Sequence, residues 1–286
     1  SVGYGKKLGN GLFDTIEQFA DYAFNKSHSY GYGYIAYQIA WLKAHYPVQY
    51  LAALLTSVKS NLDKAAVYLN ECRVLGIEVT VPDLNVARSD FEPVPTAGEG
   101  GGASQIVFGL SAVRNVGEGL VELMVAERDA NGPFIDFYDF CERCDTSVLN
   151  KRTVESLIKA GAFDAMGHPR QGLLHAHEQI IDHTVARRKE HDMGVMSLFG
   201  EVEGDGPTFD ERTTVADVEF DKMTRLAFEK EMLGLYVSDH PLLGYEAALR
   251  RRCDASVTEL EDAEEGVFRT IGGVVTNLDK KWTRRG

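Results

Sequence analysis

Cysteine is scarce in this sequence: there are four residues in 286, and only Cys141 and Cys144 lie close together. So few cysteines in a long chain do not make a disulfide framework, which agrees with a reducing compartment. Cys141 and Cys144 form a C-x-x-C pair, which has the spacing expected of half a zinc site. The other half is missing, because His168, His175 and His177 follow far downstream without ligand spacing. We expect no metal site; a metal hydrolase using these groups is an alternative that an elemental zinc assay would test.

Long apolar runs and an excess of positive charge are also absent. No stretch approaches the roughly 20 apolar residues of a membrane helix, and residues 1–5 do not resemble a signal peptide. We therefore expect a cytoplasmic protein without a membrane partner. The formal net charge of −13 argues against coating nucleic acid by bulk electrostatics, because such affinity comes from many Lys and Arg side chains. Any contact with nucleic acid must therefore be local.

The residues that are present predict a mainly α-helical chain of two or three compact units. Hydrophobic residues make up 44% and aromatic residues 10% of the chain, which is enough to build real cores. The spacing of apolar residues predicts helices over 10–57, with a polar joint at 24–29, then over 61–75 and 220–233, and several short helices over 106–191. Residues 77–82 and 270–276 are typical of extended segments.

The polar joint gathers Tyr22, Asn25, Lys26 and His28 around the start of a helix. Such a start favours anions, because its unpaired N–H groups and the helix dipole converge there. Lys26 and His28 would hold a triphosphate, while Tyr22 stacks on a base or sugar and Asn25 orients it. The alternative is an ordinary N-cap cluster with a solvated lysine and a hydrogen-bonded histidine.

Residues 109–120 have the form of a helix-hairpin-helix, in which a helix is broken by Gly-x-Gly and then restarts. Glycine lets the backbone approach a phosphate and point its N–H groups at it without reading bases. Residues 157–164 suggest a weaker second hairpin, preceded by two cations. The alternative is a helix-turn-helix joint whose glycines are only caps. The candidate DNA contacts are Arg114, Asn115, Gly117, Gly119, Lys151, Arg152, Lys159 and Gly161.

A short apolar peptide follows a charged helix and precedes an acidic loop. Its residues are Val195, Met196, Ser197, Leu198 and Phe199. Exposed, this peptide would anchor a partner's pocket, whereas the alternative is that Leu198 and Phe199 dock on their own domain. The carboxylates of Asp136, Asp139, Glu142 and Asp145 are interpreted as solvated helix faces, and we assign them no catalysis.

Residues 24–29, followed by 37–47, closely resemble the fingers of the bacterial C-family replicative DNA polymerases, and the resemblance continues through 109–119, 149–164 and 233–242. It implies a fragment, which the lack of an initiating Met also suggests. The implied parts are the C-terminal fingers (1–95), a flexible loop (96–104), a tandem helix-hairpin-helix DNA-binding region (105–192), a clamp-binding peptide with connecting helices (193–253) and the start of an OB domain (254–286), whose first strands would belong to a truncated β barrel.

The family implies template-directed addition of deoxynucleotides by two-metal phosphoryl transfer, with Mg²⁺ on palm aspartates outside this segment. The segment alone would therefore be inactive. The implied partners are primer-template DNA, a deoxynucleoside triphosphate, the sliding clamp and other replisome subunits. Val195 stands where the clamp peptide usually has Gln, which should remove a contact worth ~1 kcal/mol. The rival function is a non-enzymatic helix-hairpin-helix scaffold, which needs no nucleotide site at Asn25 and His28.

Overall fold

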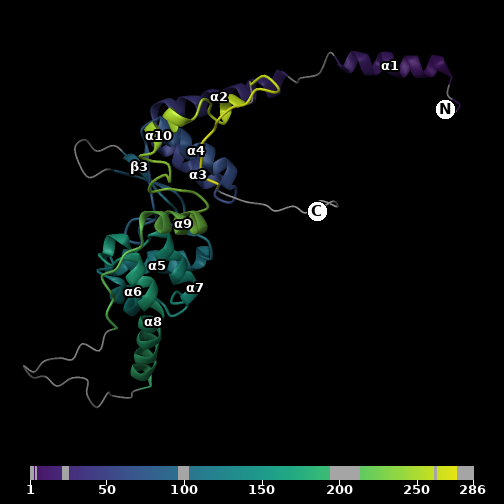
Figure 1. The fold of residues 1–286 in the computed structure, drawn as a ribbon. Helices are drawn as coiled ribbons and strands as arrows, with labels where there is room; N and C mark the ends of the chain where they lie inside the picture. The colour runs from purple at the N-terminus through teal and green to yellow at the C-terminus, as the bar shows by residue number, and fades with distance from the viewer. Residues whose placement is uncertain are drawn as a thin grey trace, which may run out of the picture. The chain divides into compact units, whose positions relative to one another are not determined.

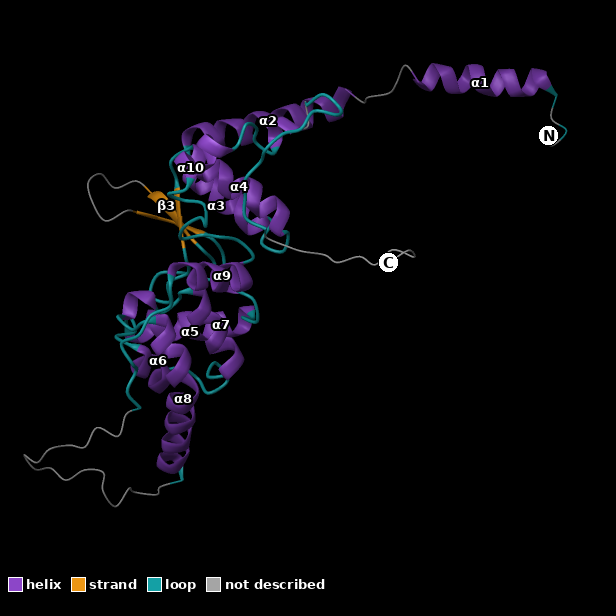
Figure 2. Cartoon of the chain, viewed as in Figure 1, coloured by secondary structure: helices purple, strands orange, loops and turns teal. Residues whose placement is uncertain are grey.

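The computed structural model describes residues 3, 5–20, 26–95, 103–193, 213–260 and 263–275. Within these ranges ten α-helices and one three-stranded sheet are formed, so the expected mainly helical fold with several units is confirmed (Figure 2). The chain divides into two compact units, Ser1–Leu51 and Ala52–Gly286. No helix of the described ranges is long and apolar enough to cross a membrane.

The first unit contains α1 (Lys6–Ala20) and α2 (Lys26–His45) and the beginning of α3 (Pro47–Ser57) (Figure 1). The helical pattern expected over 10–57 is thus present as three helices. Pro47 is the first residue of α3, where its fixed φ suits a helix start and its missing N–H costs no bond. On α2 the ring of Trp41 lies 4.5 Å from that of His45 and 5.8 Å from that of Tyr46.

The second unit includes α4 (Leu62–Val74) and a small sheet. Asn61 caps α4 by accepting a hydrogen bond from the Lys64 N–H, and the chain turns at Gly76, whose φ is +71°. The strands are β1 (Glu78–Thr80), β2 (Glu92–Pro95) and β3 (Ala103–Val107), in the order β1-β3-β2. β1 runs parallel and β2 antiparallel to β3. Strands on both sides of 96–102 therefore share one sheet; the boundary expected at 96–104 stays a prediction.

Five further helices lie beyond the sheet: α5 (Glu118–Asn131), α6 (Phe137–Arg143), α7 (Lys151–Ala160), α8 (Arg170–Asp192) and α9 (Lys222–Leu233). α7 packs against both α8 and α9. The core contains the buried rings of Phe137, Phe140 and Phe163, whose centroids lie 5.1–6.2 Å apart. Arg128 of α5 donates to the carbonyls of Leu84 and Ala87, which fixes the chain between β1 and β2 onto this core.

The C-terminal described residues contain α10 (Glu246–Arg252) and a 3₁₀ turn, η3 (Thr258–Leu260). Residues 270–275, which the sequence predicts to begin a strand, form none in the structure. The amide of Thr270 instead donates to the Asp254 carboxylate, and its carbonyl accepts from the Asp254 N–H. The assignment of 254–286 to an OB domain therefore stays a prediction.

Candidate nucleic-acid interface

The first predicted hairpin starts with a 3₁₀ turn, η1 (Leu110–Ala112), in place of the expected first helix. The amides of Leu110 and Ser111 donate to the carbonyls of Arg88 and Ser89, which ties this turn to a neighbouring segment. The chain then turns at Asn115, whose φ is +64°, a left-handed conformation that Asn adopts more readily than most residues. Gly117 is the N-cap of α5, without a side chain to bond the first amides.

The glycines of this hairpin are open to solvent. A Cβ added to Gly117 or Gly119 would meet no atom within 4 Å. Residues 117–119 are exposed, so the first amides of α5, which have no partner inside the helix, lie at an accessible surface. This start has features of an anion site, because the first amides have no partner inside the helix and the helix dipole adds partial positive charge. Glu118, between the glycines, accepts a hydrogen bond from Ser89 Oγ at 3.2 Å.

The two polar residues before the glycines have different roles. The Arg114 side chain is exposed and has no ion pair with any residue that the structure describes, while its backbone N–H donates to the Met232 carbonyl of α9 at 2.9 Å. Asn115 donates through Nδ2 to Ser156 Oγ at 3.0 Å, and its carbonyl accepts from Thr153 Oγ1. Asn115 therefore fastens the hairpin to α7, whereas the Arg114 guanidinium stays available for a ligand.

The cations of the second hairpin are mostly paired inside the fold. Lys151 Nζ lies 2.8 Å from Asp182 Oδ2, and Lys159 Nζ lies 2.8 Å from Glu155 Oε1 and 5.0 Å from the centre of the Phe228 ring. Arg152 is exposed and forms no ion pair with the described residues. Arg152 is therefore the cation of this hairpin best placed to meet an external anion.

Gly161 ends α7 with a φ of +90°, so it has the conformation of a helix C-cap. A Cβ here would overlap the guanidinium of Arg170, with Cζ only 2.8 Å away. The backbone of Gly161 is thus covered by the protein's own cation, unlike that of Gly117 and Gly119. Tertiary packing decides whether the glycine of such a turn is open or covered. The sequence pattern does not distinguish these two cases.

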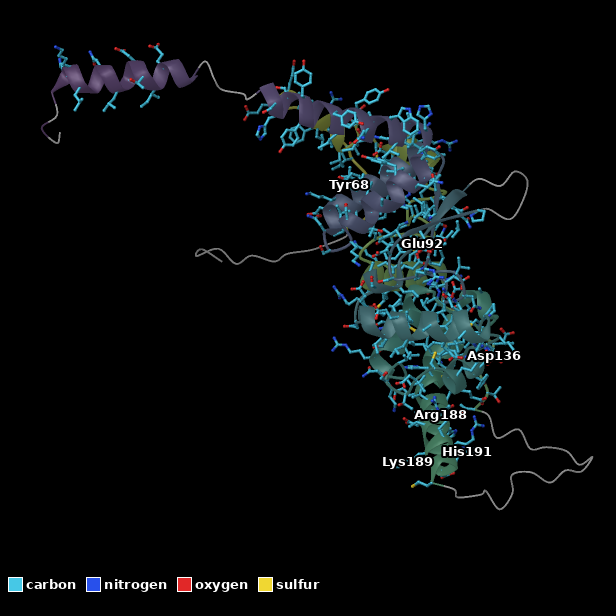
Figure 3. The ribbon with its side chains drawn as sticks, turned by 180° about the vertical axis from the view of Figure 1, so that it is seen from behind. Tyr68, Glu92, Asp136, Arg188, Lys189 and His191 are labelled. Atoms are coloured by element: carbon cyan, nitrogen blue, oxygen red, sulfur yellow. The ribbon has the colours of Figure 1, made fainter. Side chains whose placement is uncertain are left out.

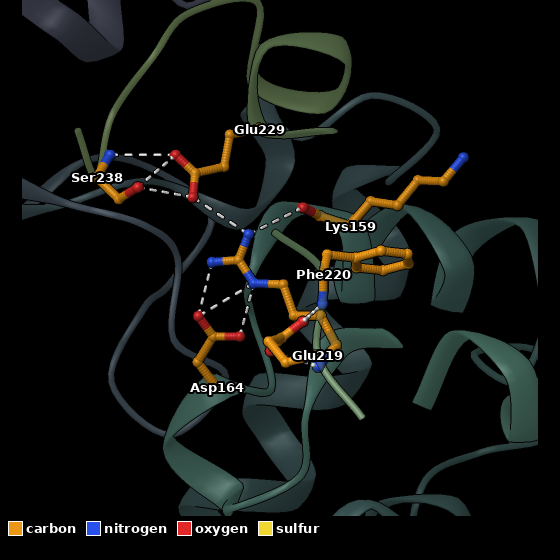
Figure 4. A network of polar contacts seen from close by, with 7 residues as sticks. Lys159, Asp164, Glu219, Phe220, Glu229 and Ser238 are labelled. Carbon is orange, nitrogen blue, oxygen red and sulfur yellow. Dashed lines mark hydrogen bonds and ion pairs between the residues drawn. The ribbon is translucent and has the colours of Figure 1, made fainter. Parts of the chain in front are cut away.

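Arg170 is the centre of a buried network of polar contacts that the sequence did not indicate (Figure 4). Its Nε and Nη2 donate to Asp164 at 2.8 and 2.6 Å, and its Nη1 donates to Glu229 at 3.2 Å. Glu229 also accepts hydrogen bonds from the N–H and hydroxyl of Ser238. Arg170 is 2% and Glu229 0% exposed. Burial disfavours the charge of Arg170, but Asp164 and Glu229 overcome this and raise its pKa.

We expect Gly161→Ala to destabilise the fold without weakening a backbone contact to DNA. A left-handed alanine costs about 1–2 kcal/mol, and the new methyl group would also displace the Arg170 guanidinium from its two carboxylates. Urea unfolding measures the loss. Gly167→Ala is the matched control, since Gly167 also has a positive φ but its added Cβ would meet nothing within 4 Å. Equal losses in the two variants would contradict a role for Arg170.

The remaining candidate residues are placed as follows. Tyr22 and Asn25 lie outside the described residues, and so does the peptide 195–199. Lys26 is the first residue of α2. His28 is exposed on the first turn of α2, with its ring 5.8 Å from that of Tyr32. The nucleotide and clamp contacts therefore remain predictions.

Cys141 and Cys144 are buried in the core, 0% and 1% exposed. Burial raises the pKa of both thiols, that of Cys144 to about 12. In the described ranges no group of three or more His, Cys, Asp or Glu side chains is arranged to hold a metal ion. The metal-hydrolase alternative stays a prediction, which the elemental zinc assay tests.

Carboxylates on and near α6 have structural partners. Asp136 caps α6 by accepting from the Asp139 N–H, and Asp139 pairs with Arg143. Glu142 pairs with Arg187 of α8. Arg188 donates to the carbonyls of Cys141 and Cys144 at the end of α6, while Lys189 and His191 lie exposed near the end of α8 (Figure 3).

Comparisons with known proteins place this geometry in a family. A model described as "Helix-hairpin-helix motif" matches residues 76–173, which include both hairpins and Arg170. DNA polymerase III subunit alpha of Mycobacterium tuberculosis is 42% identical over 96% of this chain. The alpha subunits of Thermus aquaticus and Pseudomonas aeruginosa are 40% and 37% identical over 97% and 98% of it. The chain belongs to the DNA polymerase III alpha-subunit family.

The resemblance drawn from the residues is thus confirmed over nearly the whole chain. The chain spans 22–24% of the length of these three alpha subunits. The helix-hairpin-helix match begins at residue 76, so it includes the three strands of the sheet as well as the hairpins.

Proposed function

We propose that this chain binds the backbone of duplex DNA through the hairpin at Gly117 and Gly119, as part of a template-directed DNA polymerase. The observation that carries the proposal is the open start of α5: both glycines face free space, and the exposed Arg114 precedes them. Amides reach phosphate oxygens without reading bases, as a replicative enzyme that moves along any sequence requires. Arg114 and Arg152 add charge, so a chain of net charge −13 meets DNA at a restricted site.

The hairpin is a rigid platform for this contact. Arg114 is tied by its backbone to α9, and Asn115 to α7, so the amides of α5 are fixed relative to both helices. Lys151 and Lys159 are engaged in ion pairs and Gly161 is covered, so we place them in the support of this platform. Fixed donors cost little ordering entropy when DNA binds, which favours affinity.

The polymerase role extends to residues at the start of α2. We propose that Tyr22, Asn25 and His28 face the incoming deoxynucleoside triphosphate with Lys26 nearby, supported by the exposure of His28 on the first turn of α2. Mg²⁺, held by carboxylates outside this chain, would stabilise the negative charge that develops during phosphoryl transfer. Because those carboxylates lie outside this chain, we propose that it does not polymerise alone.

The peptide Val195, Met196, Ser197, Leu198 and Phe199 is proposed to bind the sliding clamp through the Leu198-Phe199 pair. Val195 in the place of Gln should cost this contact ~1 kcal/mol. Other replisome subunits are proposed as further partners. All four cysteines are free, which supports a reducing, cytoplasmic location.

A double variant tests the proposed DNA contact. We expect Gly117→Val with Gly119→Val to abolish most salt-dependent binding to labelled primer-template DNA, because the side chains would stand between the amides and the phosphate. Both positions are exposed and an added Cβ meets no atom within 4 Å, so we expect the protein to stay folded. Fluorescence anisotropy over a salt series measures the binding, and circular dichroism checks the fold.

The matched control is Gly9→Val with Gly11→Val, on exposed α1, where added Cβ atoms also meet nothing within 4 Å. If both pairs of substitutions weaken binding equally, or neither does, Gly117 and Gly119 are only caps.

The rival function is a DNA-binding scaffold without a nucleotide site. It predicts that adding a deoxynucleoside triphosphate leaves the hydrogen exchange around His28 unchanged.

A further inference from the structure

A negative side chain stands at the proposed DNA contact itself. Glu118 is the first residue of α5 and lies between Gly117 and Gly119. The backbone N–H groups of these three residues form no hydrogen bond with any residue in the described part of the chain. A phosphate bound at these donors would lie close to the Glu118 side chain, and like charges repel. Where the carboxylate points therefore decides how strongly it opposes binding.

The Glu118 carboxylate is held by a residue outside the hairpin. Ser89, in the chain between β1 and β2, donates through Oγ to Glu118 Oε1 at 3.2 Å. Among the described residues, no hydrogen bond joins this carboxylate to the amides of residues 117–119. Glu118 is exposed and carries a long side chain, whereas Ser89 is half-buried. The hydroxyl of Ser89 thus fixes a side chain that would otherwise change rotamer in solvent.

Ser89 is itself firmly anchored. Its carbonyl accepts two hydrogen bonds from Ser111 of η1, from the N–H at 3.2 Å and from Oγ at 2.7 Å. The next residue, Asp90, pairs with Lys59 at 2.9 Å, and Lys59 also donates to Ser111 Oγ at 3.2 Å. A Cβ added to Gly109 would lie 2.5 Å from the Ser89 carbonyl oxygen, so the two backbones are in contact. Ser89 is therefore a fixed point beside the start of α5.

We infer that Ser89 is a positioning residue for the DNA contact, because its hydroxyl keeps the Glu118 carboxylate away from the free amides of α5. A negative charge is attracted to the start of a helix, so a released carboxylate would compete with phosphate for these donors. With Ser89 in place, Glu118 weakens the contact by repulsion but leaves the donors open. The pair of Ser89 and Glu118 therefore sets the strength of the contact. The inference rests on the proposed DNA-binding function and adds how its site is tuned.

The first test removes the charge of Glu118. We expect Glu118→Gln to bind labelled primer-template DNA about threefold more tightly at low salt, the usual size of a charge effect at a helix start. The gain should shrink as salt is added, because exposed charges are screened. The matched control is Glu122→Gln, which removes the same charge from an exposed residue one turn further along α5. If Glu118→Gln binds no more tightly than Glu122→Gln, the inference is wrong.

The second test removes the hydroxyl of Ser89. We expect Ser89→Ala to bind the same DNA about threefold more weakly at low salt, because the released carboxylate reaches the amides. Ser89→Thr keeps a hydroxyl and should bind as the wild type does. The double variant Ser89→Ala with Glu118→Gln should bind as tightly as Glu118→Gln alone, since no charge is left to position. If Ser89→Ala weakens binding equally in both backgrounds, or in neither, Ser89 does not act through Glu118 and the inference is overturned.

Failure of this inference is distinguishable from failure of the hairpin proposal. If Gly117→Val with Gly119→Val loses binding while the Ser89 and Glu118 variants bind as the wild type does, the hairpin contact stands and only the positioning role is wrong. If the glycine variant binds normally, the hairpin contact itself is wrong, and the positioning role is wrong with it. Circular dichroism of every variant checks that the fold is intact.

Discussion

Replacing Arg170 by alanine is expected to lower the free energy of unfolding by about 3–5 kcal/mol, because it leaves a buried carboxylate without its cation. Glu229 is 0% exposed, and Arg170 is its ion-pair partner at 3.2 Å. Ser238 would still donate two hydrogen bonds to Glu229 but brings no charge. Urea denaturation followed by circular dichroism measures the loss.

Arg187→Ala is the matched control for this prediction. Arg187 also pairs with a glutamate, Glu142, but the two side chains are 60% and 40% exposed. Exposed pairs contribute no more than about 1 kcal/mol. In addition, Arg170→Ala with Glu229→Gln should recover part of the lost stability, since the buried amide is neutral. A loss no larger than that of Arg187→Ala would show that the network is not what holds these elements together.

Phe140→Ala is expected to cost a similar 3–5 kcal/mol, through lost burial and the cavity left behind. The Phe140 side chain is 0% exposed, and its ring lies 5.3 Å from that of Phe134 and 5.1 Å from that of Phe163. These rings come from three separate segments, so the cavity would loosen the core beneath α6. Thermal and urea unfolding both report the change.

Phe268→Ala provides the comparison at the opposite extreme of burial, because its ring is 99% exposed. Removing an exposed ring leaves no cavity, so stability should hardly change. If the Phe140 and Phe268 variants unfold at the same urea concentration, the ring cluster around Phe140 does not contribute to the stability of the fold.

Much of the local structure followed from the sequence. Apolar spacing predicts the helices at 61–75 and 220–233, and the structure has them as α4 and α9, with Asn61 and Asp221 as N-caps and Gly234 as a C-cap. The strand at 77–82 was predicted from β-branched residues after a glycine and is present as β1. The expected helix before Asn115 was wrong, because the Arg114 N–H, which would bond the Leu110 carbonyl in an α-helix, donates to Met232, and Asn115 has a positive φ.

In the candidate site, too, some features were predictable from the sequence and others only from the tertiary structure. The sequence by itself determined the family, through motifs such as residues 24–29. It also identified Gly117, Gly119 and Gly161 as candidate backbone contacts, since a residue without a side chain is recognised from the sequence alone. Only the tertiary structure decided that Gly117 and Gly119 are open while Gly161 is covered by Arg170. It also revealed the pairing of Arg170 with Glu229, 59 residues away. Short-range preferences are encoded locally, whereas exposure and ion pairing depend on which distant segments pack together.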